Sequence, residues 1–351
     1  MKKVLSLVLV AVVVATLFAL AACGNKTVTD GNAATTLKLG LGVAASYGEA
    51  KNADGDTDGS AKVTVDAVAV LLDEEGKIAD IAIDTLDAST AWTSAGNAAA
   101  STEAKTKYEL GADYNMAAYG TKHDGSEGKV LEWFEQADAF ESVAKGKTLD
   151  EVKAFMTEDT YTTGELAAAG CTISVGGIMK ALEKAVANAV DSKATANDKL
   201  NLAFATSISN TDATEEKDGS VGVDATIVAA AVNAEGKVAA AKTDALSAKV
   251  TFDTKGAATY DAAAAISTKL ELGDNYNMAA YGTKHDGSEG AVLEWYAQAA
   301  AFDAALEGKA AADFAALADA DGYGTGDLAA AGCTIGISDM IKAATAAATV
   351  A

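Results

Sequence analysis

The sequence is poor in several residue types whose presence would mark particular classes of protein. Its 351 residues include no proline, and only three cysteines and two histidines. So few thiols and imidazoles exclude a disulfide framework, a zinc ribbon and a multi-haem protein. Basic residues are outnumbered by acidic ones, 27 to 50, which gives a formal charge of −23. Because such a charge repels a phosphate backbone, it argues against nucleic acid as a general partner.

Hydrophobic residues make up 50% of the chain, which is the composition of a folded protein and not of an acidic disordered tail. Two lysines follow Met1, and residues 4–22 are apolar except for one serine and one threonine. Basic residues followed by an apolar core and small residues predict a secretory signal peptide over residues 1–22. A simple transmembrane anchor is the alternative. No second long apolar stretch follows, which argues against a channel or transporter subunit.

The end of this leader, Leu20-Ala-Ala-Cys23-Gly24, resembles the lipobox of bacterial lipoproteins. The resemblance implies that Cys23 is lipidated on its sulfur and becomes the first residue of the mature chain. Residues 23–36 are mostly small and polar, so we expect a flexible tether there. The mature body is then expected on the extracellular face of the cell membrane, held by its lipid anchor.

Internal repetition dominates the rest of the sequence. Residues 114–128 recur letter for letter at 276–290, a spacing of 162. The spacing is 160 upstream, where Gly76 matches Gly236, and 163 where Leu37 matches Leu200, so the first repeat has three extra residues near 52–58. Each unit has the size of a domain. We therefore predict one domain over 37–190, a polar junction around 191–198, and a second domain over 199–346.

Hydrophobic periodicity changes midway through each repeat. Residues 63–69 and 78–86 alternate around an acidic glycine turn, which predicts a β-hairpin. Residues 130–143 have apolar side chains at three- and four-residue steps, which predicts a helix, and 178–190 predict another. Between them, Thr148 and Glu151 have the spacing of a capping box. Strands followed by helices indicate an α+β fold, with two tandem homologous domains that each have helices packed on an antiparallel sheet.

The two histidines, His123 and His285, occupy the same position of the two repeats, in the sequence Lys-His-Asp-Gly-Ser-Glu-Gly. With Asp124 and Glu127, a histidine could form a metal or acid–base site. The segment lacks the ligand spacing of an EF-hand, and one histidine per domain is poor for zinc. We favour a surface turn ahead of a helix, with Ser126 or Asp124 near its N-cap.

Cys171 and Cys333 also match between the repeats, each between small and apolar residues. No histidine or cation is near in sequence to lower a thiol pKa, so we interpret both as buried structural residues. Three aromatic pairs could stack on a planar cofactor, but aromatic residues at helical spacing more often belong to a core. These pairs are Trp133 and Trp295, Tyr119 and Tyr281, and Tyr114 and Tyr276.

A stretch rich in hydroxyl groups precedes the hairpin of the second repeat, over residues 205–219. Such a segment is expected to be exposed, and it is either a place for covalent modification or an ordinary solvated loop. It contains Thr211-Asp-Ala-Thr214. Together with three other segments, it resembles the Gram-positive extracellular electron-transfer flavoproteins, pheromone-peptide lipoproteins with two FMN-modified domains. Those segments begin at Lys145, at Thr268 and at Glu294.

The resemblance implies that FMN is attached through its phosphate to a threonine hydroxyl by a separate flavin transferase. The acceptor context in that family is close to Ser/Thr-Gly-Ala-Thr. Thr211 and Thr214 match this context, with Asp212 in place of the glycine, so Thr214 is the candidate acceptor. In the first repeat we align Lys51 with Thr214. Because lysine cannot form a phosphoester, the acceptor there is absent or is a neighbour, Ser46 or Thr57.

The resemblance further implies a non-catalytic electron carrier. A membrane quinol-oxidising dehydrogenase would supply its electrons, and external acceptors such as ferric iron would receive them. With a covalent cofactor, the chain needs neither a catalytic base nor a pocket of high affinity. A different reading is a non-redox surface lipoprotein with a duplicated ligand-binding or adhesive module. A third is a source of a signalling peptide, since residues 7–22 of the leader could be released.

Overall fold

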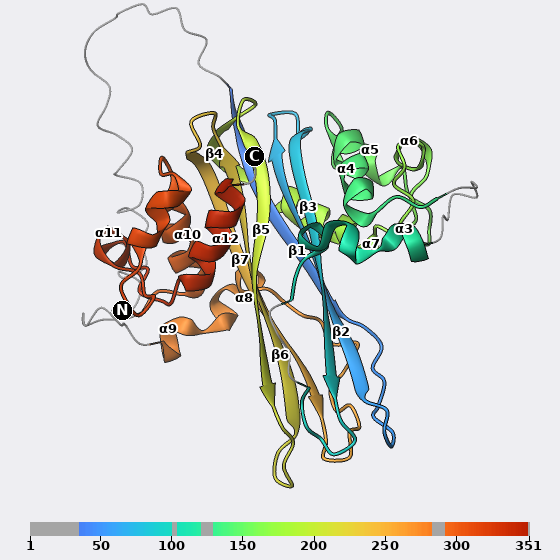
Figure 1. Cartoon of the computed structure of the whole chain (residues 1–351). Helices are drawn as coiled ribbons and strands as arrows, with labels where there is room; N and C mark the ends of the chain where they lie inside the picture. Colours follow the sequence, from blue (N-terminus) through green and yellow to red (C-terminus); the bar gives the residue numbers. More distant parts are fainter. Residues whose placement is uncertain (1–34, 100–103, 121–128, 283–291, 350–351) are drawn as a thin grey trace, which may run out of the picture. The chain divides into compact units, whose positions relative to one another are not determined.

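The computed structural model describes residues 35–99, 104–120, 129–282 and 292–349 (Figure 1). Residues Thr35–Ala351 form one compact unit. Cys23, both histidines and the whole leader lie outside the described residues. Among the described ranges, no helix has the length and apolar character needed to cross a membrane.

Each repeat contributes one antiparallel sheet. The first sheet has the strand order β3-β2-β1-β4, and the second has the order β5-β6-β7. The predicted hairpin of each repeat is confirmed as β2–β3 and as β6–β7. The strands are β1 (Thr36–Tyr47), β2 (Gly59–Leu72), β3 (Ile78–Trp92), β4 (Val190–Thr195), β5 (Lys199–Thr211), β6 (Gly219–Val232) and β7 (Val238–Phe252).

Helices follow the hairpin in both repeats, as predicted. The capping box of Thr148 and Glu151 is confirmed, because each residue accepts from the main-chain N–H of the other. The first repeat has α2 (Lys107–Leu110), η1 (Gly111–Tyr114), α3 (Met116–Tyr119), α4 (Trp133–Ala144), α5 (Leu149–Lys153), α6 (Gly164–Ala168) and α7 (Gly176–Ala187). The second has α8 (Lys269–Leu272), η2 (Gly273–Tyr276), α9 (Met278–Tyr281), α10 (Trp295–Leu306), η3 (Ala311–Leu317), α11 (Gly326–Ala330) and α12 (Ser338–Thr349).

Three hydrophobic cores hold these elements in four layers. The central core lies between the two sheets and takes side chains from both repeats, such as Val65 and Phe204. Each outer core lies between one sheet and the helices of the same repeat, around Phe140 or Phe302. Figure 1 shows the two sheets in the middle, with the green helices on one side and the red ones on the other. The α+β prediction is confirmed, and the two repeats also share a core.

This layering explains the sequence pattern of the strands. Val63 and Val65 of β2 face the central core, whereas Val68 and Val70 face the helices. Both faces of the sheet are buried where helices cover it, so that part of the strand is continuously apolar. The part of the strand beyond the helices has one buried face, so its apolar and polar residues alternate.

The segment predicted as a polar junction, 191–198, contains most of strand β4, which spans Val190–Thr195. This strand pairs with β1, with Leu39 opposite Val190 and Thr36 opposite Thr195. The Ser192 hydroxyl also donates to the Leu37 carbonyl at 2.6 Å. The segment is polar because it is an edge strand, and its pairing satisfies main-chain groups at the edge of β1.

The register of the sheets also corrects the alignment of β1 with β5. Lys38 lies opposite Leu72, and Lys199 lies opposite Val232, so Leu200 is the counterpart of Leu39 and not of Leu37. The first repeat therefore has one extra residue between its first two strands and not three. A shift of two residues keeps every side chain on the same face, which is why the hydrophobic pattern did not reveal it.

Candidate functional site

Thr214 lies at the tip of the β5–β6 hairpin and is exposed. Its main-chain N–H donates to the Lys217 carbonyl at 2.8 Å, and the Lys217 N–H donates to the Thr214 hydroxyl at 3.1 Å. Thr211, the last residue of β5, is also exposed and pairs with Ser220. The structure thus brings both predicted threonines to one tip, and the side chain of Thr214 is accessible from outside.

The first repeat has the same turn with different residues. Asp54 and Thr57 exchange two main-chain hydrogen bonds of 2.9 Å, as Thr214 and Lys217 do in the second repeat. Asp54 is therefore the counterpart of Thr214, and the alignment of Lys51 with Thr214 is wrong, because Lys51 pairs with Ser60. The extra residue of this loop precedes the turn, where neither periodicity nor identity fixes an alignment.

The two other candidates of the first repeat are exposed but occupy different positions. Thr57 lies on the turn at the place that Lys217 occupies in the second repeat. Ser46 lies in β1 opposite Thr64, away from the turn. No hydroxyl of the first repeat therefore has the position of the Thr214 hydroxyl.

Asp212, which departs from the glycine of the family context, has a structural role. Its carboxylate accepts the main-chain N–H of Ala98 from the first repeat at 2.9 Å. Asn52 is its counterpart and accepts the N–H of Ala258 at 2.9 Å. This reciprocal exchange ties the tip of each repeat to the strand end of the other, so the residue in front of Ala213 is fixed by the interface.

The tip is strongly acidic. Around Thr214 the exposed side chains include those of Asp212, Glu215, Glu216 and Asp218, and Lys217 is the single cation of this turn. A phosphate ester on Thr214 would gain charge compensation from Lys217 and experience repulsion from the carboxylates. Salt would screen both effects, since the groups are solvated.

The FMN group that the resemblance implies fits this tip in one respect. Thr214 offers the required alcohol, and it is reachable by a modifying enzyme. A cavity of about 300 Å³ in the second repeat is not near it: Lys242, which lines this cavity, pairs with Ala229 of β6, ten residues from Gly219 at the tip end. Ten strand residues span about 33 Å. This cavity is therefore out of reach of a ring attached to Thr214.

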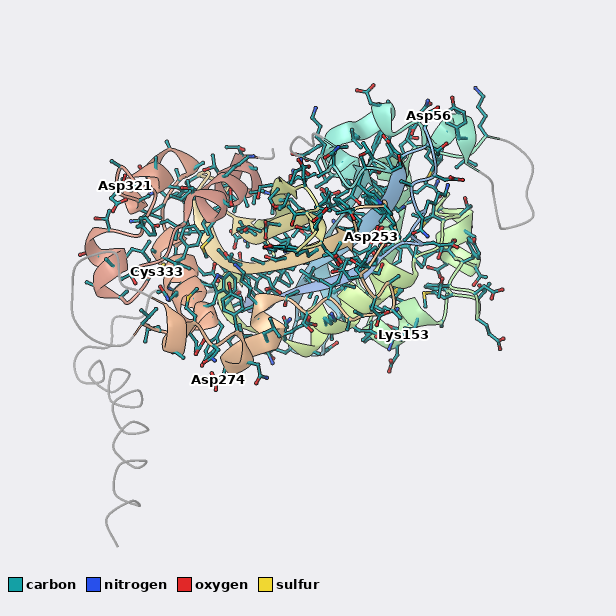
Figure 2. The ribbon with its side chains drawn as sticks, turned by 90° about the horizontal axis from the view of Figure 1, so that it is seen from below. Asp56, Lys153, Asp253, Asp274, Asp321 and Cys333 are labelled. Atoms are coloured by element: carbon teal, nitrogen blue, oxygen red, sulfur yellow. The ribbon has the colours of Figure 1, made fainter. Side chains whose placement is uncertain are left out.

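Neither described cysteine is a candidate nucleophile. Cys171 and Cys333 are fully buried, and Figure 2 shows Cys333 within the helical layer of the second repeat. Burial raises the pKa of the Cys171 thiol to about 12 and that of Cys333 to about 11. The interpretation of both as structural residues is confirmed.

Two of the aromatic pairs belong to the helical cores. Trp133 and Trp295 are buried, and each approaches a lysine ammonium, that of Lys107 or Lys269, at 5.4 Å from the ring centroid. The same two lysine ammonium groups lie over the Tyr114 and Tyr276 rings, 5.1 and 5.3 Å from the ring centroids. These rings pack on cations and core side chains and are not free platforms for a planar cofactor. Tyr119, by contrast, is 84% exposed.

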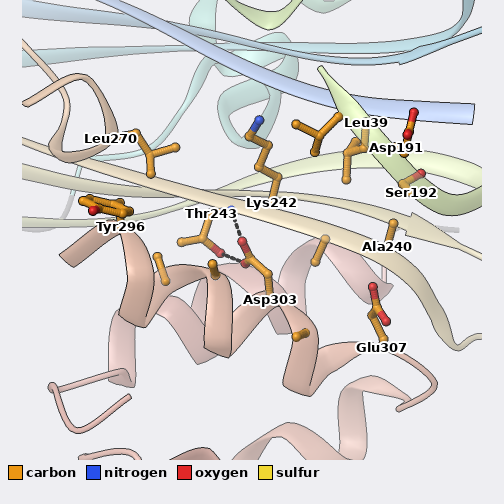
Figure 3. A pocket seen from close by; sticks show the side chains of 15 residues that line it. Leu39, Asp191, Ser192, Ala240, Lys242, Thr243, Leu270, Tyr296, Asp303 and Glu307 are labelled. Atoms are coloured by element: carbon orange, nitrogen blue, oxygen red, sulfur yellow. Dashed lines mark hydrogen bonds between the residues drawn. The ribbon is translucent and has the colours of Figure 1, made fainter. Parts of the chain in front are cut away.

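A cavity of about 300 Å³ lies between α10, β7 and the edge strand β4, and sequence patterns did not predict it. At its wall, Asp303 of α10 accepts the main-chain N–H of Thr243 at 3.1 Å and the Thr243 hydroxyl at 2.5 Å (Figure 3). Burial raises the pKa of Asp303 to about 6. A single carboxylate on a helix has no distinctive spacing, so sequence reasoning missed it.

Comparison of the chain with protein-family models, with curated proteins and with solved structures finds no match.

Proposed function

We propose that this chain is a lipid-anchored extracellular electron carrier with FMN esterified through its phosphate to Thr214. The observation that carries the proposal is the accessible hydroxyl of Thr214 on a hydrogen-bonded turn, within the segment that resembles the flavoprotein family. When bound, the flavin supplies the reversible redox chemistry. The chain itself would hold the attachment point and keep it exposed to external electron acceptors.

Three features of the tip support Thr214 as the acceptor. The turn bonds between Thr214 and Lys217 fix the backbone on both sides of the hydroxyl. Because the residues from Glu215 to Asp218 are exposed, a flavin transferase could reach the hydroxyl without unfolding a strand. The tie between Asp212 and Ala98 holds the hairpin against the other repeat.

The proposal includes one flavin per chain. Asp54 stands in the first repeat where Thr214 stands in the second. A carboxylate would give a hydrolysable acyl phosphate instead of a stable phosphoester, so the first tip is expected to stay unmodified. Ser46 and Thr57 remain hydroxyls that a less selective transferase could reach.

The anchor and the charge complete the proposed role. Lipid on Cys23 would keep the carrier near a membrane quinol-oxidising dehydrogenase and raise the effective concentration of the two proteins. The net charge of −23 would attract cationic acceptors such as ferric iron and repel anionic chelates. The rate of electron exchange should therefore depend on ionic strength, with opposite signs for the two kinds of acceptor.

The decisive experiment co-expresses the chain with a flavin transferase and measures the intact mass. We expect one FMN minus water on a peptide that contains Thr214, and reversible bleaching with dithionite. Thr214→Ala should give an unmodified chain, while the control Thr211→Ala should keep its flavin. Asp54→Thr should add a second flavin. A colourless wild-type chain under these conditions would contradict the proposal.

A second candidate function is a non-redox surface lipoprotein that binds a small ligand. The observation in its favour is the cavity beside Asp303, which is not lined by any residue of the Thr214 turn. This candidate requires ligand binding by the unmodified chain, whereas the electron carrier requires the flavin. The two functions are therefore separable by experiment.

A further inference from the structure

The cavity lies where the first sheet, through Leu39 of β1 and residues 190–192 of β4, meets β7, α8 and α10 of the second repeat. Strand β4 has no counterpart in the three-stranded second sheet, so the surroundings of the two repeats differ here. In the first repeat Tyr108 fills the corresponding space, and its hydroxyl donates to Asp138 of α4. Leu270 is the counterpart of Tyr108, since both main-chain N–H groups donate to equivalent buried aspartates, Asp84 and Asp244. Ala300 of α10 replaces Asp138. Two side-chain replacements and the presence of β4 thus distinguish this site from the corresponding place in the first repeat.

The wall of this cavity is largely apolar. Leu39 and Val190 contribute from the first sheet, Leu270 from α8, and a row of alanines from β7 and α10. Figure 3 shows these side chains around the space between β4 and α10. A volume of about 300 Å³ lies at the lower end of the range of small-molecule sites. The wall is therefore suited to a short hydrocarbon body.

Hydrogen-bond donors at the cavity are already engaged with the protein. The Lys242 ammonium donates to the main-chain and side-chain oxygens of Asn188 at 2.6 and 2.9 Å, and Figure 3 shows it directed away from Asp303. The Tyr296 hydroxyl donates to Asp274 at 3.1 Å. The Ser192 hydroxyl is likewise bonded to a main-chain carbonyl.

Acceptors, in contrast, retain capacity. Asp303 accepts one hydrogen bond on each carboxylate oxygen, and each oxygen has a second lone pair. Glu307 lies four residues further along the chain, directly after α10, and pairs with Lys193 at 2.5 Å. Asp191 of β4 is exposed and forms no ion pair with any described residue. Three carboxylates and one ammonium thus line the cavity.

From this combination of an apolar wall and free carboxylate acceptors, we propose that the cavity binds a small alkylammonium ligand. The hydrocarbon chain lies against Leu39, Val190 and Leu270, and the ammonium donates to Asp303. An anionic ligand of the same length would meet three carboxylates, and a neutral one would bring no positive charge to Asp303. The inference is independent of the flavin, since it concerns the unmodified chain.

The test is calorimetric titration of the unflavinylated mature chain with n-pentylammonium, 1-pentanol and pentanoate. We expect the ammonium compound to bind at least about tenfold more tightly than the alcohol, and pentanoate not to bind. The double variant Leu270→Tyr with Ala300→Asp reproduces the pair of the first repeat and fills the cavity, so it should abolish binding. The control Glu141→Gln changes the corresponding carboxylate of the first repeat and should leave binding unchanged.

Two further variants keep the test decisive if the double variant unfolds. Ala300→Leu fills part of the cavity without a polar group, and Asp303→Asn keeps an acceptor for Thr243 but removes the charge. Both variants should lower the affinity for n-pentylammonium at least about tenfold while they keep the wild-type circular dichroism spectrum. Equal affinity for the alcohol and the ammonium compound, or unchanged binding by the folded variants, would overturn the proposal.

Discussion

Trp92 and Phe252 stack face to face, with ring centroids 5.1 Å apart and ring planes at 1° to each other. They are the last residues of β3 and β7 and occupy the same position in the two repeats. The Trp92 indole N–H also donates to the Gly256 carbonyl of the other repeat at 2.8 Å. Because these two equivalent residues contact each other, the repeats are related by an approximate local two-fold symmetry at this stack.

The stack should be important for stability. Phe252 is fully buried in the central core, so Phe252→Ala should lower the free energy of unfolding by about 3–5 kcal/mol. Urea denaturation followed by circular dichroism measures this change. Leu293→Ala, at a side chain that is 43% exposed, is the control and should cost much less. Because the repeats share the central core, we also expect one unfolding transition, and two separate transitions would contradict the shared core.

Gly219 should be intolerant of a side chain because of the same stack. A Cβ at this position would lie 2.4 Å from Cε2 of Phe252 and 2.7 Å from the main-chain nitrogen of Ala213. Gly219→Ala should therefore destabilise the chain by about 1–3 kcal/mol, the usual cost of overpacking. In Gly222→Ala the new Cβ would meet only the Ser209 side chain, which can rotate away. A smaller loss of stability for Gly219→Ala than for Gly222→Ala would refute the packing argument.

Stability should increase as the pH falls from 8 to 5. Burial raises the pKa of Glu141 to about 8 and that of Asp84 to about 7, above their values in an unfolded chain near 4. The folded chain then holds protons that the unfolded chain releases, so the free energy of unfolding decreases as the pH rises through this window. Each such group contributes a slope of at most about 1.4 kcal/mol per pH unit.

Glu141→Gln isolates one of these groups. The variant should have a flatter pH dependence of the unfolding free energy between pH 5 and 8, measured by urea denaturation in a series of buffers. Glu74→Gln, at an exposed residue of the β2–β3 turn, is the matched control and should keep the wild-type slope. If the slope is unchanged in Glu141→Gln, this carboxyl is not a source of the pH dependence.

The thiols of Cys171 and Cys333 should react only after unfolding. Both side chains are buried, and burial raises both thiol pKa values well above neutral pH. Iodoacetamide at pH 8 should label neither in the native chain and both in concentrated urea, as read by mass spectrometry of peptides. Rapid labelling of either cysteine in the native chain would contradict the burial of these thiols.

Much of the fold could be predicted because it depends on local chemistry. The β2–β3 hairpin follows from alternation around a glycine turn, and the helix start at Thr148 follows from its three-residue spacing to Glu151. Cys171 is buried where its small and apolar neighbours suggested. The duplication is visible as identity between the repeats. These features involve neighbours in sequence, so periodicity and spacing determine them.

Relationships between distant segments required the tertiary structure. The counterpart of Thr214 is Asp54, because turn bonds and strand register define it and identity does not. The sequence of β4 is polar and does not predict a strand, and the segment becomes a strand by pairing with the edge of β1.

The sequence by itself determined that this protein is a duplicated, acidic α+β chain, since composition, identity and periodicity are properties of the order of its residues. Only the tertiary structure decided that the two sheets share a core, that Trp92 meets Phe252, and that a cavity opens beside Asp303. The physical reason is that packing and cavity formation depend on which side chains meet across space, and residues far apart in sequence carry no local signal of that meeting.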